Sequence, residues 1–371
     1  MFFNKLNLRN RLLKLKRKIG GKDRFTGWVQ EVKKIYKSFL ILILIISVAV
    51  TGCKKGKEQT DKKEETEENI DLSGHSYVIK VGDETVNYNE AMVYVLLLKQ
   101  QYEPNLGKEI WDYNTEDGIN FEDMAKEEVM DEIIQLKIIK DKAKEFETVL
   151  DEDEKEEALE TATRHFNVIS AKDKENYGIT LGTLERVYRD NLLAGKVFDV
   201  VTSDTDTEVS DEEARQITIY QILIKTTKQD LNGETIPLTK KQKQDALKKA
   251  KKLLKQGKKA ESFKTFAKEN TEDKKAEYTF GRGDMNKEVE EAAFALKKGQ
   301  FSGVVVSEDG YHILYCANDF DENATADKKE EIILDRQTKY FQDTYKGWLD
   351  DYKVTVNEKE WNKINFNETA E

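Results

Sequence analysis

Residues that cross-link or interrupt a chain are scarce in this sequence. Its 371 residues include two cysteines and two prolines. Two cysteines cannot make a disulfide framework, so the folded parts must depend on packed apolar cores for their stability. Few prolines and long stretches rich in lysine and glutamate favour extended helices. Phosphate-binding glycine loops, nucleophile elbows and zinc-protease helices are also missing, which argues against the enzyme classes that these motifs mark.

The chain is acidic overall, but basic residues gather at its N-terminus. The net charge is −11, and residues 1–38 carry twelve Lys or Arg against two Asp or Glu, which leaves −21 for the remainder. Nucleic acids and anionic membranes bind basic surfaces. The net charge of the remainder therefore argues against both as partners.

One apolar run, Phe39–Val50, is twelve residues long. An ordinary membrane-spanning helix needs about 20 residues. The run has the length of the hydrophobic region of a secretory signal, and lysines within residues 33–37 supply its positive flank. It leads into Val50-Thr51-Gly52-Cys53, which resembles the bacterial lipobox. The resemblance implies cleavage before Cys53, a lipid on the Cys53 sulfur, and a mature protein anchored on the extracytoplasmic face of the cell membrane. An uncleaved anchor is the alternative.

Residues 1–31 are unusual before such a signal, and two interpretations remain open. The stretch can form a basic amphipathic helix that lies on a membrane. Alternatively, translation starts at Val32, and the signal begins there. Residues 1–52 are accordingly predicted to be a signal sequence with a basic N-terminal extension.

Composition divides the rest of the chain into segments. Residues 53–74 have almost nothing apolar to bury and are predicted to be a disordered tether. Residues 75–205 show amphipathic helical spacing, clearest over Phe121–Phe146, and are predicted to form a helical domain. Residues 321–371 return to the same pattern and are predicted to complete that domain with a C-terminal helix. A different pattern occupies residues 212–320.

Residues 212–320 mix strand and helix patterns. Ile217–Lys225 alternates like a buried strand, and residues 239–256 place apolar side chains at helical spacing between many lysines. Shorter helices are predicted at 258–267 and 288–296, and further strands at 303–307 and 311–316. This order predicts a compact α+β domain with a small antiparallel sheet.

Several motifs in this domain resemble those of parvulin-type peptidylprolyl isomerases. They are Ile222-Leu223-Ile224, Phe280-Gly281-Arg282-Gly283-Asp284-Met285, Glu290–Leu296, Gly299–Ser302 and Gly310-Tyr311-His312-Ile313-Leu314. The resemblance implies an α+β fold in which a four-stranded antiparallel sheet with helices is inserted in a mostly α-helical, chaperone-like module formed by both ends of the mature chain. With the lipobox, the arrangement resembles the lipid-anchored extracytoplasmic foldases of Gram-positive bacteria.

The activity implied by this resemblance is rotation about the peptide bond that precedes proline. Uncatalysed, it takes roughly tens to hundreds of seconds. A pocket accelerates it by holding the proline ring, excluding water and favouring the twisted amide over the planar one. The expected partners are unfolded or newly exported polypeptides with X-Pro bonds. Neither a cofactor nor a metal is expected.

By resemblance, the floor of the pocket holds a histidine on the first strand, an Asp or Cys after the second helix, and the histidine of the Gly-Tyr-His motif. Asp273 and His312 match the last two positions. Gln221 stands where the first-strand histidine is expected. Glutamine keeps a neutral hydrogen bond but lacks the tautomers and the protonation of imidazole. The predicted catalytic set is therefore His312, Asp273 and Gln221, with an activity that is weak or lost.

The resemblance also implies apolar substrate-binding residues around the loop and the third helix. The matching residues are Phe280, Met285, Val289 and Phe294. For Met285 and Phe294, core packing is an equally good interpretation. Three functions are compatible with these features: a membrane-tethered isomerase, a non-catalytic chaperone with a degenerate isomerase domain, and a passive envelope lipoprotein. The motif set argues against the third, and a homodimer formed through the outer module remains open.

Overall fold

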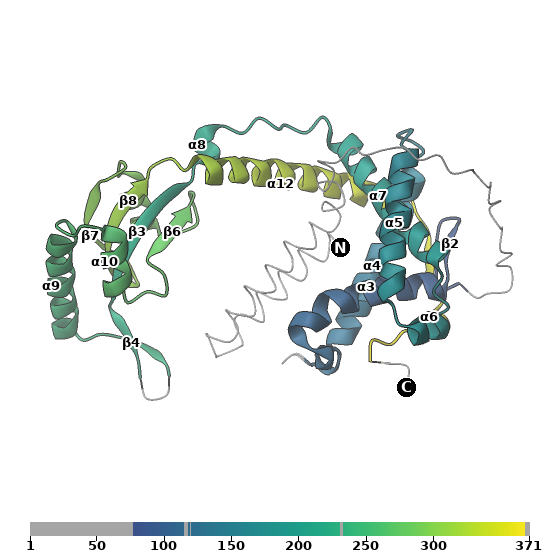
Figure 1. Cartoon of the computed structure of the whole chain (residues 1–371), viewed down its shortest axis with the longest axis horizontal. Coiled ribbons are helices and arrows are strands. Elements are labelled where there is room, and N and C mark those ends of the chain that lie inside the picture. The colour runs from purple at the N-terminus through teal and green to yellow at the C-terminus, as the bar shows by residue number, and fades with distance from the viewer. Residues whose placement is uncertain (1–76, 115–117, 119, 231–232, 368–371) are drawn as a thin grey trace. The chain divides into compact units, whose positions relative to one another are not determined.

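The structure, a computed structural model, describes residues 77–114, 118, 120–230 and 233–367 (Figure 1). The predicted signal, the predicted tether and the predicted lipidation site Cys53 lie outside these residues. The chain divides into two compact units. We call the chain up to Asp204 together with Lys339–Glu371 the outer unit, and Thr205–Thr338 the inserted unit.

A small antiparallel sheet in the outer unit joins the two ends of the chain. Its strands are β1 (Ile79–Val81), β2 (Glu84–Val86) and β9 (Val354–Val356), in the order β2-β1-β9. Ile79 pairs with Val86 on one side and with Val356 on the other. The outer unit is therefore built from segments on both sides of the inserted unit.

Helices make up most of the outer unit. They are α3 (Tyr88–Leu106), η1 (Lys108–Asp112), α4 (Phe121–Lys142), α5 (Glu152–Val168), α6 (Ala171–Tyr177), α7 (Leu181–Thr202), α13 (Glu358–Trp361) and the later part of α12 (Glu322–Leu349). The apolar stripe predicted over Phe121–Phe146 corresponds mainly to α4, which buries Val129, Ile133 and Ile138. Asn120 begins this helix by accepting hydrogen bonds from two backbone N–H groups of its first turn.

A buried lysine links three of these helices. Lys137 of α4 is 2% exposed, and its Nζ lies 2.6 Å from Glu90 Oε1 of α3 and 2.6 Å from Asp190 Oδ2 of α7. Burial lowers the pKa of Lys137, but the two carboxylates outweigh burial and raise the pKa above its ordinary value. The lysine therefore stays charged and holds α3, α4 and α7 together through paired charges.

The inserted unit is built on a four-stranded antiparallel sheet (Figure 1). Helices pack on both faces of this sheet. The strands are β3 (Ile217–Lys225), β6 (Glu277–Phe280), β7 (Phe301–Val306) and β8 (Gly310–Asn318), in the order β6-β3-β8-β7. Helices α9 (Lys240–Gly257) and α10 (Phe263–Asn270) pack on one face. Helix α11 (Lys287–Phe294) packs on the other. The short helix α8 (Asp211–Ala214) and the hairpin of β4 (Thr227–Gln229) and β5 (Thr235–Pro237) complete the unit.

This architecture confirms the predicted fold class, a parvulin-like antiparallel sheet inserted in a mostly helical module. The domain boundaries derived from the sequence stay predictions. The two units divide after Asp204 and again after Thr338, which lies inside α12. Within the described ranges, no helix combines the length and the apolar character needed to cross a membrane.

Candidate functional site

Alternation along β3 and β8 places Gln221 and His312 on the sheet face that α11 covers. Successive side chains of a strand point to opposite faces, and Ile219 and Leu314 belong to the apolar cluster under α11. Gln221 is paired with Leu314 across the two strands, and His312 with Leu223, so Gln221 and His312 are diagonal neighbours. Both are buried, with 2% and 3% of their surface exposed.

His312 is hydrogen bonded to Gln221, and Gln221 is hydrogen bonded to Asp273. His312 Nδ1 lies 3.1 Å from Gln221 Oε1, and Gln221 Nε2 donates to Asp273 Oδ2 at 3.2 Å. Because a carboxylate can only accept, the amide nitrogen faces Asp273 and the amide oxygen faces His312. That oxygen also only accepts, so the proton of neutral His312 is assigned to Nδ1. The structure thus brings the three residues of the predicted catalytic set together, while their catalytic role stays a prediction.

The chain of hydrogen bonds continues at both ends. His312 Nε2 lies 2.7 Å from Ser307 Oγ, which accepts from the backbone N–H of Asp309 at 3.1 Å. With the proton on Nδ1, Nε2 accepts the hydroxyl proton of Ser307. At the other end, the Tyr278 hydroxyl donates to Asp273 Oδ2 at 2.7 Å. Every hydrogen bond from Ser307 to Tyr278 has a donor and an acceptor when His312 is neutral.

Burial keeps His312 and Tyr278 neutral. It lowers the pKa of His312, and the more distant carboxylates of Asp309 and Asp273 oppose this shift only in part. Burial likewise raises the pKa of Tyr278, and the hydrogen bond to Asp273 adds to the rise. At neutral pH, the floor therefore combines a neutral imidazole, an amide and a phenol with the Asp273 carboxylate that accepts from the amide and the phenol.

A loop that runs beside β3 positions Asp273. In the segment Thr271–Ala276, the backbone N–H of Glu272 donates to the carbonyl of Leu223 at 2.9 Å, and the Gln221 N–H donates to the carbonyl of Ala276 at 2.8 Å. A hollow of about 450 Å³ opens beside this loop, lined by Lys268, Thr271, Asp273, Lys274, Lys275, Ala276 and Glu277. Asp273 is thus the member of the predicted set that borders solvent.

Gly310 allows the close approach of β8 to β3 that positions His312. Its φ is +152°, and a Cβ at this position would lie 2.2 Å from the carbonyl oxygen of Ile224. A side chain cannot be accommodated so close to backbone, so this pairing requires glycine. The histidine follows two residues later on the same strand.

The four predicted substrate-binding residues lie in one apolar cluster between α11 and the sheet. Phe280, Val289 and Phe294 are 4%, 1% and 8% exposed, while Met285 is partly buried. The rings of Phe280 and Phe294 meet edge to face, with centroids 6.0 Å apart. Three of the four residues are therefore buried as core residues are, and Met285 offers the largest accessible surface. A role in substrate binding stays a prediction for all four.

Two arginines cover the ring of Phe294. The guanidinium carbon of Arg282 lies 4.0 Å from the ring centroid, and that of Arg215 lies 5.5 Å from it. Arg282 NH1 also lies 3.5 Å from Glu290 Oε1 of α11. Arg282 therefore covers part of the Phe294 ring and is held there by a cation–π contact and an ion pair.

Within the part of the chain that the structure describes, no three His, Cys, Asp or Glu side chains are grouped as a metal site requires. Cys316 is a buried, free thiol whose pKa is raised, mainly by burial. It is therefore protonated at neutral pH, the form that is neither a metal ligand nor a nucleophile.

Sequence patterns alone did not identify three residues around the site. Ser307 lies in the turn between β7 and β8, where serine is a common residue. Tyr278 could have been found, since alternation on β6 places it on the same face as Phe280. Arg282 lies within the Phe-Gly-Arg-Gly motif, but nothing local predicts that its side chain covers Phe294.

The chain is similar to known proteins, both over the inserted unit and over most of its length. Residues 222–318 match the family model of the rotamase, PPIC-type PPIase domain. The chain is 24% identical over 320 residues to the foldase protein PrsA of Caldanaerobacter subterraneus subsp. tengcongensis, covering 83% of this chain and 92% of that protein. It is 22% identical over 353 residues to the foldase protein PrsA of Clostridium botulinum (strain Langeland), covering 89% and 99%. The crystal structure of the peptidylprolyl isomerase PrsA from Bacillus cereus matches with 21% identity and a TM-score of 0.33, covering 67% of this chain and 94% of that one.

These matches confirm the resemblance predicted from the motifs. The inserted unit contains a PPIC-type, parvulin-like domain, and the chain is similar to PrsA foldases over most of its length. The domain therefore resembles peptidylprolyl isomerases. The matched range contains Asp273 and His312 and begins one residue after Gln221.

Proposed function

We propose that the protein is a membrane-tethered foldase whose inserted unit catalyses cis–trans isomerisation of X-Pro bonds in exported polypeptides. The observation that carries this proposal is the hydrogen-bonded chain that joins Ser307, His312, Gln221 and Asp273 inside a PPIC-type domain. Gln221 accepts from His312 and donates to Asp273. The glutamine therefore connects His312 to Asp273 by hydrogen bonds, although the expected histidine is absent.

The rotation requires no covalent step, so a floor in which the histidine is neutral suits it. Resonance holds the amide planar with a barrier of about 18–20 kcal/mol. A surface that excludes water disfavours the polar, planar amide relative to the twisted one, which lowers this barrier. In this mechanism Met285 and Phe294 contact the proline ring, Arg282 swings off Phe294 to admit it, and neutral His312 avoids the hydration that an imidazolium would require.

A protease-coupled assay on a proline tetrapeptide tests this activity in the mature chain. We expect the mature chain to accelerate isomerisation and Phe294→Leu to reduce the acceleration about tenfold, because leucine offers less contact to the ring. Phe320→Leu is the matched control, since Phe320 lies in the same unit and is 36% exposed. No acceleration by the mature chain, or equal losses in the two variants, would overturn the proposal.

The proposed location rests on residues 39–53. An apolar run of signal length that ends in Val50-Thr51-Gly52-Cys53 supports lipidation of Cys53 and a site of action on the extracytoplasmic face of the membrane. Cells grown with radiolabelled palmitate should label the wild-type protein and not Cys53→Ser. A wild-type protein that takes up no label would contradict the tether.

A chaperone without isomerase activity is the second candidate. Gln221 in place of the expected histidine favours it, as does the burial of Phe280, Val289 and Phe294. In that case the mature chain suppresses aggregation of an unfolded client but leaves tetrapeptide isomerisation at its uncatalysed rate. A Gln221→His variant that gains isomerase activity would then locate the defect at this position. A homodimer formed through the outer unit is a further prediction, which sedimentation of the mature chain tests.

A further inference from the structure

Helix α9 and the two residues after it concentrate positive charge on a chain that is otherwise acidic. Residues 240–259 contain ten lysines and one aspartate, a net charge of +9. The whole chain after residue 38 carries −21. Net charge therefore conceals a strongly basic surface on the inserted unit.

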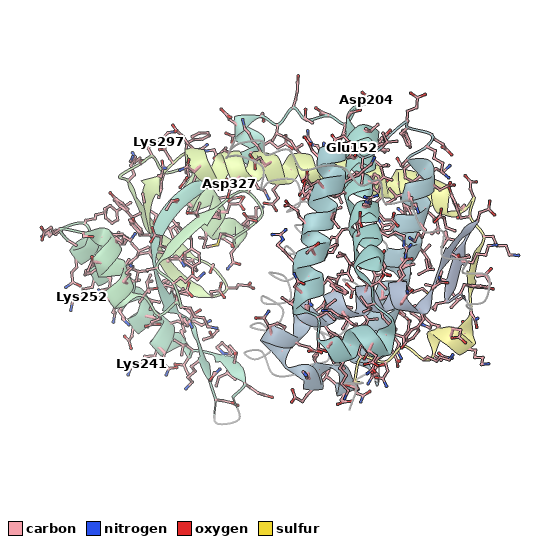
Figure 2. All side chains as sticks on the ribbon, turned by 45° about the vertical axis from the view of Figure 1, so that its right-hand side comes forward. Glu152, Asp204, Lys241, Lys252, Lys297 and Asp327 are labelled. Carbon is pink, nitrogen blue, oxygen red and sulfur yellow. The ribbon has the colours of Figure 1, made fainter. Side chains whose placement is uncertain are left out.

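The lysines of this segment lie on its solvent side. Helix α9 buries Ala250, Leu253 and Gly257, which face the sheet, and leaves its opposite side open. Figure 2 labels Lys241 and Lys252 on this helix. The exposed lysines, which we call the α9 lysine surface, are Lys240, Lys241, Lys248, Lys249, Lys251, Lys252, Lys255, Lys258 and Lys259.

Acidic neighbours neutralise little of this charge. Lys249 Nζ lies 2.6 Å from Glu272 Oε1, and Lys248 Nζ lies 3.7 Å from Asp245 Oδ1. The other seven lysines of the surface form no ion pair with a described residue. Like charges at this density repel one another, so an anionic partner that binds the surface relieves their repulsion.

We infer that the α9 lysine surface docks onto the anionic phospholipid headgroups of a membrane. Residues 240–259 contain neither arginine nor an aromatic residue. Arginine forks and stacked aromatic rings are common in nucleic-acid binding surfaces, and the cores of protein interfaces are depleted in lysine. Lysine alone, on the open side of a helix, suits a fluid layer of headgroups, which offers charge without fixed geometry.

Such a contact is weak for a free protein and effective for a tethered one. Each lysine close to an anionic surface strengthens binding about fivefold, and the attraction extends only about 8 Å at physiological ionic strength. The lipid proposed for Cys53 would keep the surface near the membrane and make docking an intramolecular event. The inference uses that tether for its physiological setting, and its test below uses protein without lipid.

Vesicle sedimentation tests the inference directly. The chain from Lys54 to Glu371, made without lipid, is mixed with phosphatidylcholine vesicles with or without phosphatidylglycerol. The surface variant exchanges four exposed, unpaired lysines for glutamine: Lys241→Gln, Lys251→Gln, Lys252→Gln and Lys255→Gln. The control variant removes the same charge from exposed lysines elsewhere: Lys108→Gln, Lys172→Gln, Lys298→Gln and Lys359→Gln. Glutamine and lysine have similar helix propensities, so α9 should remain folded.

We expect binding to the anionic vesicles at low salt, none to phosphatidylcholine alone, and release in about 0.5 M NaCl. The surface variant should bind at least about tenfold more weakly than wild type, and the control variant within about threefold of it. Equal binding by the two variants, or no binding of the wild-type chain to anionic vesicles, overturns the inference. Surface-dependent binding to polyglutamate without binding to vesicles would assign the surface to an acidic polypeptide instead. Tetrapeptide isomerisation by the surface variant should remain at the wild-type rate, so a failure of docking and a failure of catalysis are told apart.

Discussion

Replacing Gln221 by leucine tests whether the hydrogen-bonded chain stabilises the inserted unit. The change removes the bond to His312 Nδ1 and the bond to Asp273 Oδ2. Asp273 keeps its bond from Tyr278, whereas Nδ1 of His312 is left buried and unpaired, whichever ring nitrogen carries the proton. An orphaned buried donor or acceptor costs about 1–3 kcal/mol, and the apolar surface of leucine offsets part of this. We therefore expect the free energy of unfolding of this unit to fall by about 2 kcal/mol.

Each unit carries its own natural probe for this measurement. The described tryptophans, Trp111, Trp348 and Trp361, all lie in the outer unit. Cys316 is buried in β8, and it is the one cysteine of a chain that begins at Lys54. Thiol labelling of that chain therefore reports opening of the inserted unit. A loss of about 2 kcal/mol corresponds to labelling about 30-fold faster.

An exposed glutamine in the same unit provides the matched control. Gln244 lies on the open side of α9, and Gln244→Leu should change the labelling rate by less than about threefold. The urea midpoint followed by tryptophan fluorescence should stay unchanged in both variants, because the substitutions leave the outer unit intact. If Gln221→Leu is labelled at the wild-type rate, the hydrogen bonds of Gln221 do not stabilise the folded unit, and the reasoning is refuted.

Three further outcomes follow from buried charge and backbone geometry. The His312 ring should titrate below 6.5, because burial lowers its pKa. Between the folded-state pKa and about 6.5, the folded state therefore binds fewer protons than the unfolded chain. Over this range the stability of the inserted unit should rise with pH. An NMR titration that gives 6.5 or more would contradict this. Lys137→Met removes the nearest cation from the buried carboxylates of Glu90 and Asp190, which keep only longer ion pairs, with Arg186 at 3.7 Å and with Lys140 at 3.8 Å. The change should cost the outer unit about 3 kcal/mol by tryptophan fluorescence in urea. Adding Glu90→Gln and Asp190→Asn should restore most of that loss, and no recovery would argue against the buried ion pairs. Gly310→Ala places a methyl group against the neighbouring strand, so thiol labelling should approach the unfolded rate, whereas wild-type protection would disprove the steric argument.

The inserted sheet could be predicted because its motifs coincide with strong local signals. Ile217–Lys225 alternates as a strand must, and the Gly-Tyr-His motif begins with the glycine that the strand pairing requires. Asp273 followed only from resemblance, since the loop that carries it has no strand pattern. Its bond to Gln221 depends on the tertiary path of Thr271–Ala276 along β3.

Contacts between distant or irregular segments could not be predicted. The register of β1 with β9 joins residues at opposite ends of the folded chain, and no local pattern encodes it. The hydroxyl of Ser307 reaches His312 only because β7 and β8 meet at their turn. Net charge did not reveal the basic residues of α9, because an average over the chain hides them among the acidic remainder.

The most direct test of the proposed function is the rate of proline tetrapeptide isomerisation by the mature chain and by Gln221→Leu. The comparison is made where thiol labelling shows that the inserted unit is folded in both proteins. We expect acceleration by the mature chain and a loss of at least about tenfold in the variant, because the polar floor beneath the proline site is interrupted. No acceleration by the mature chain, or an undiminished rate in Gln221→Leu, would contradict a catalytic role for this floor.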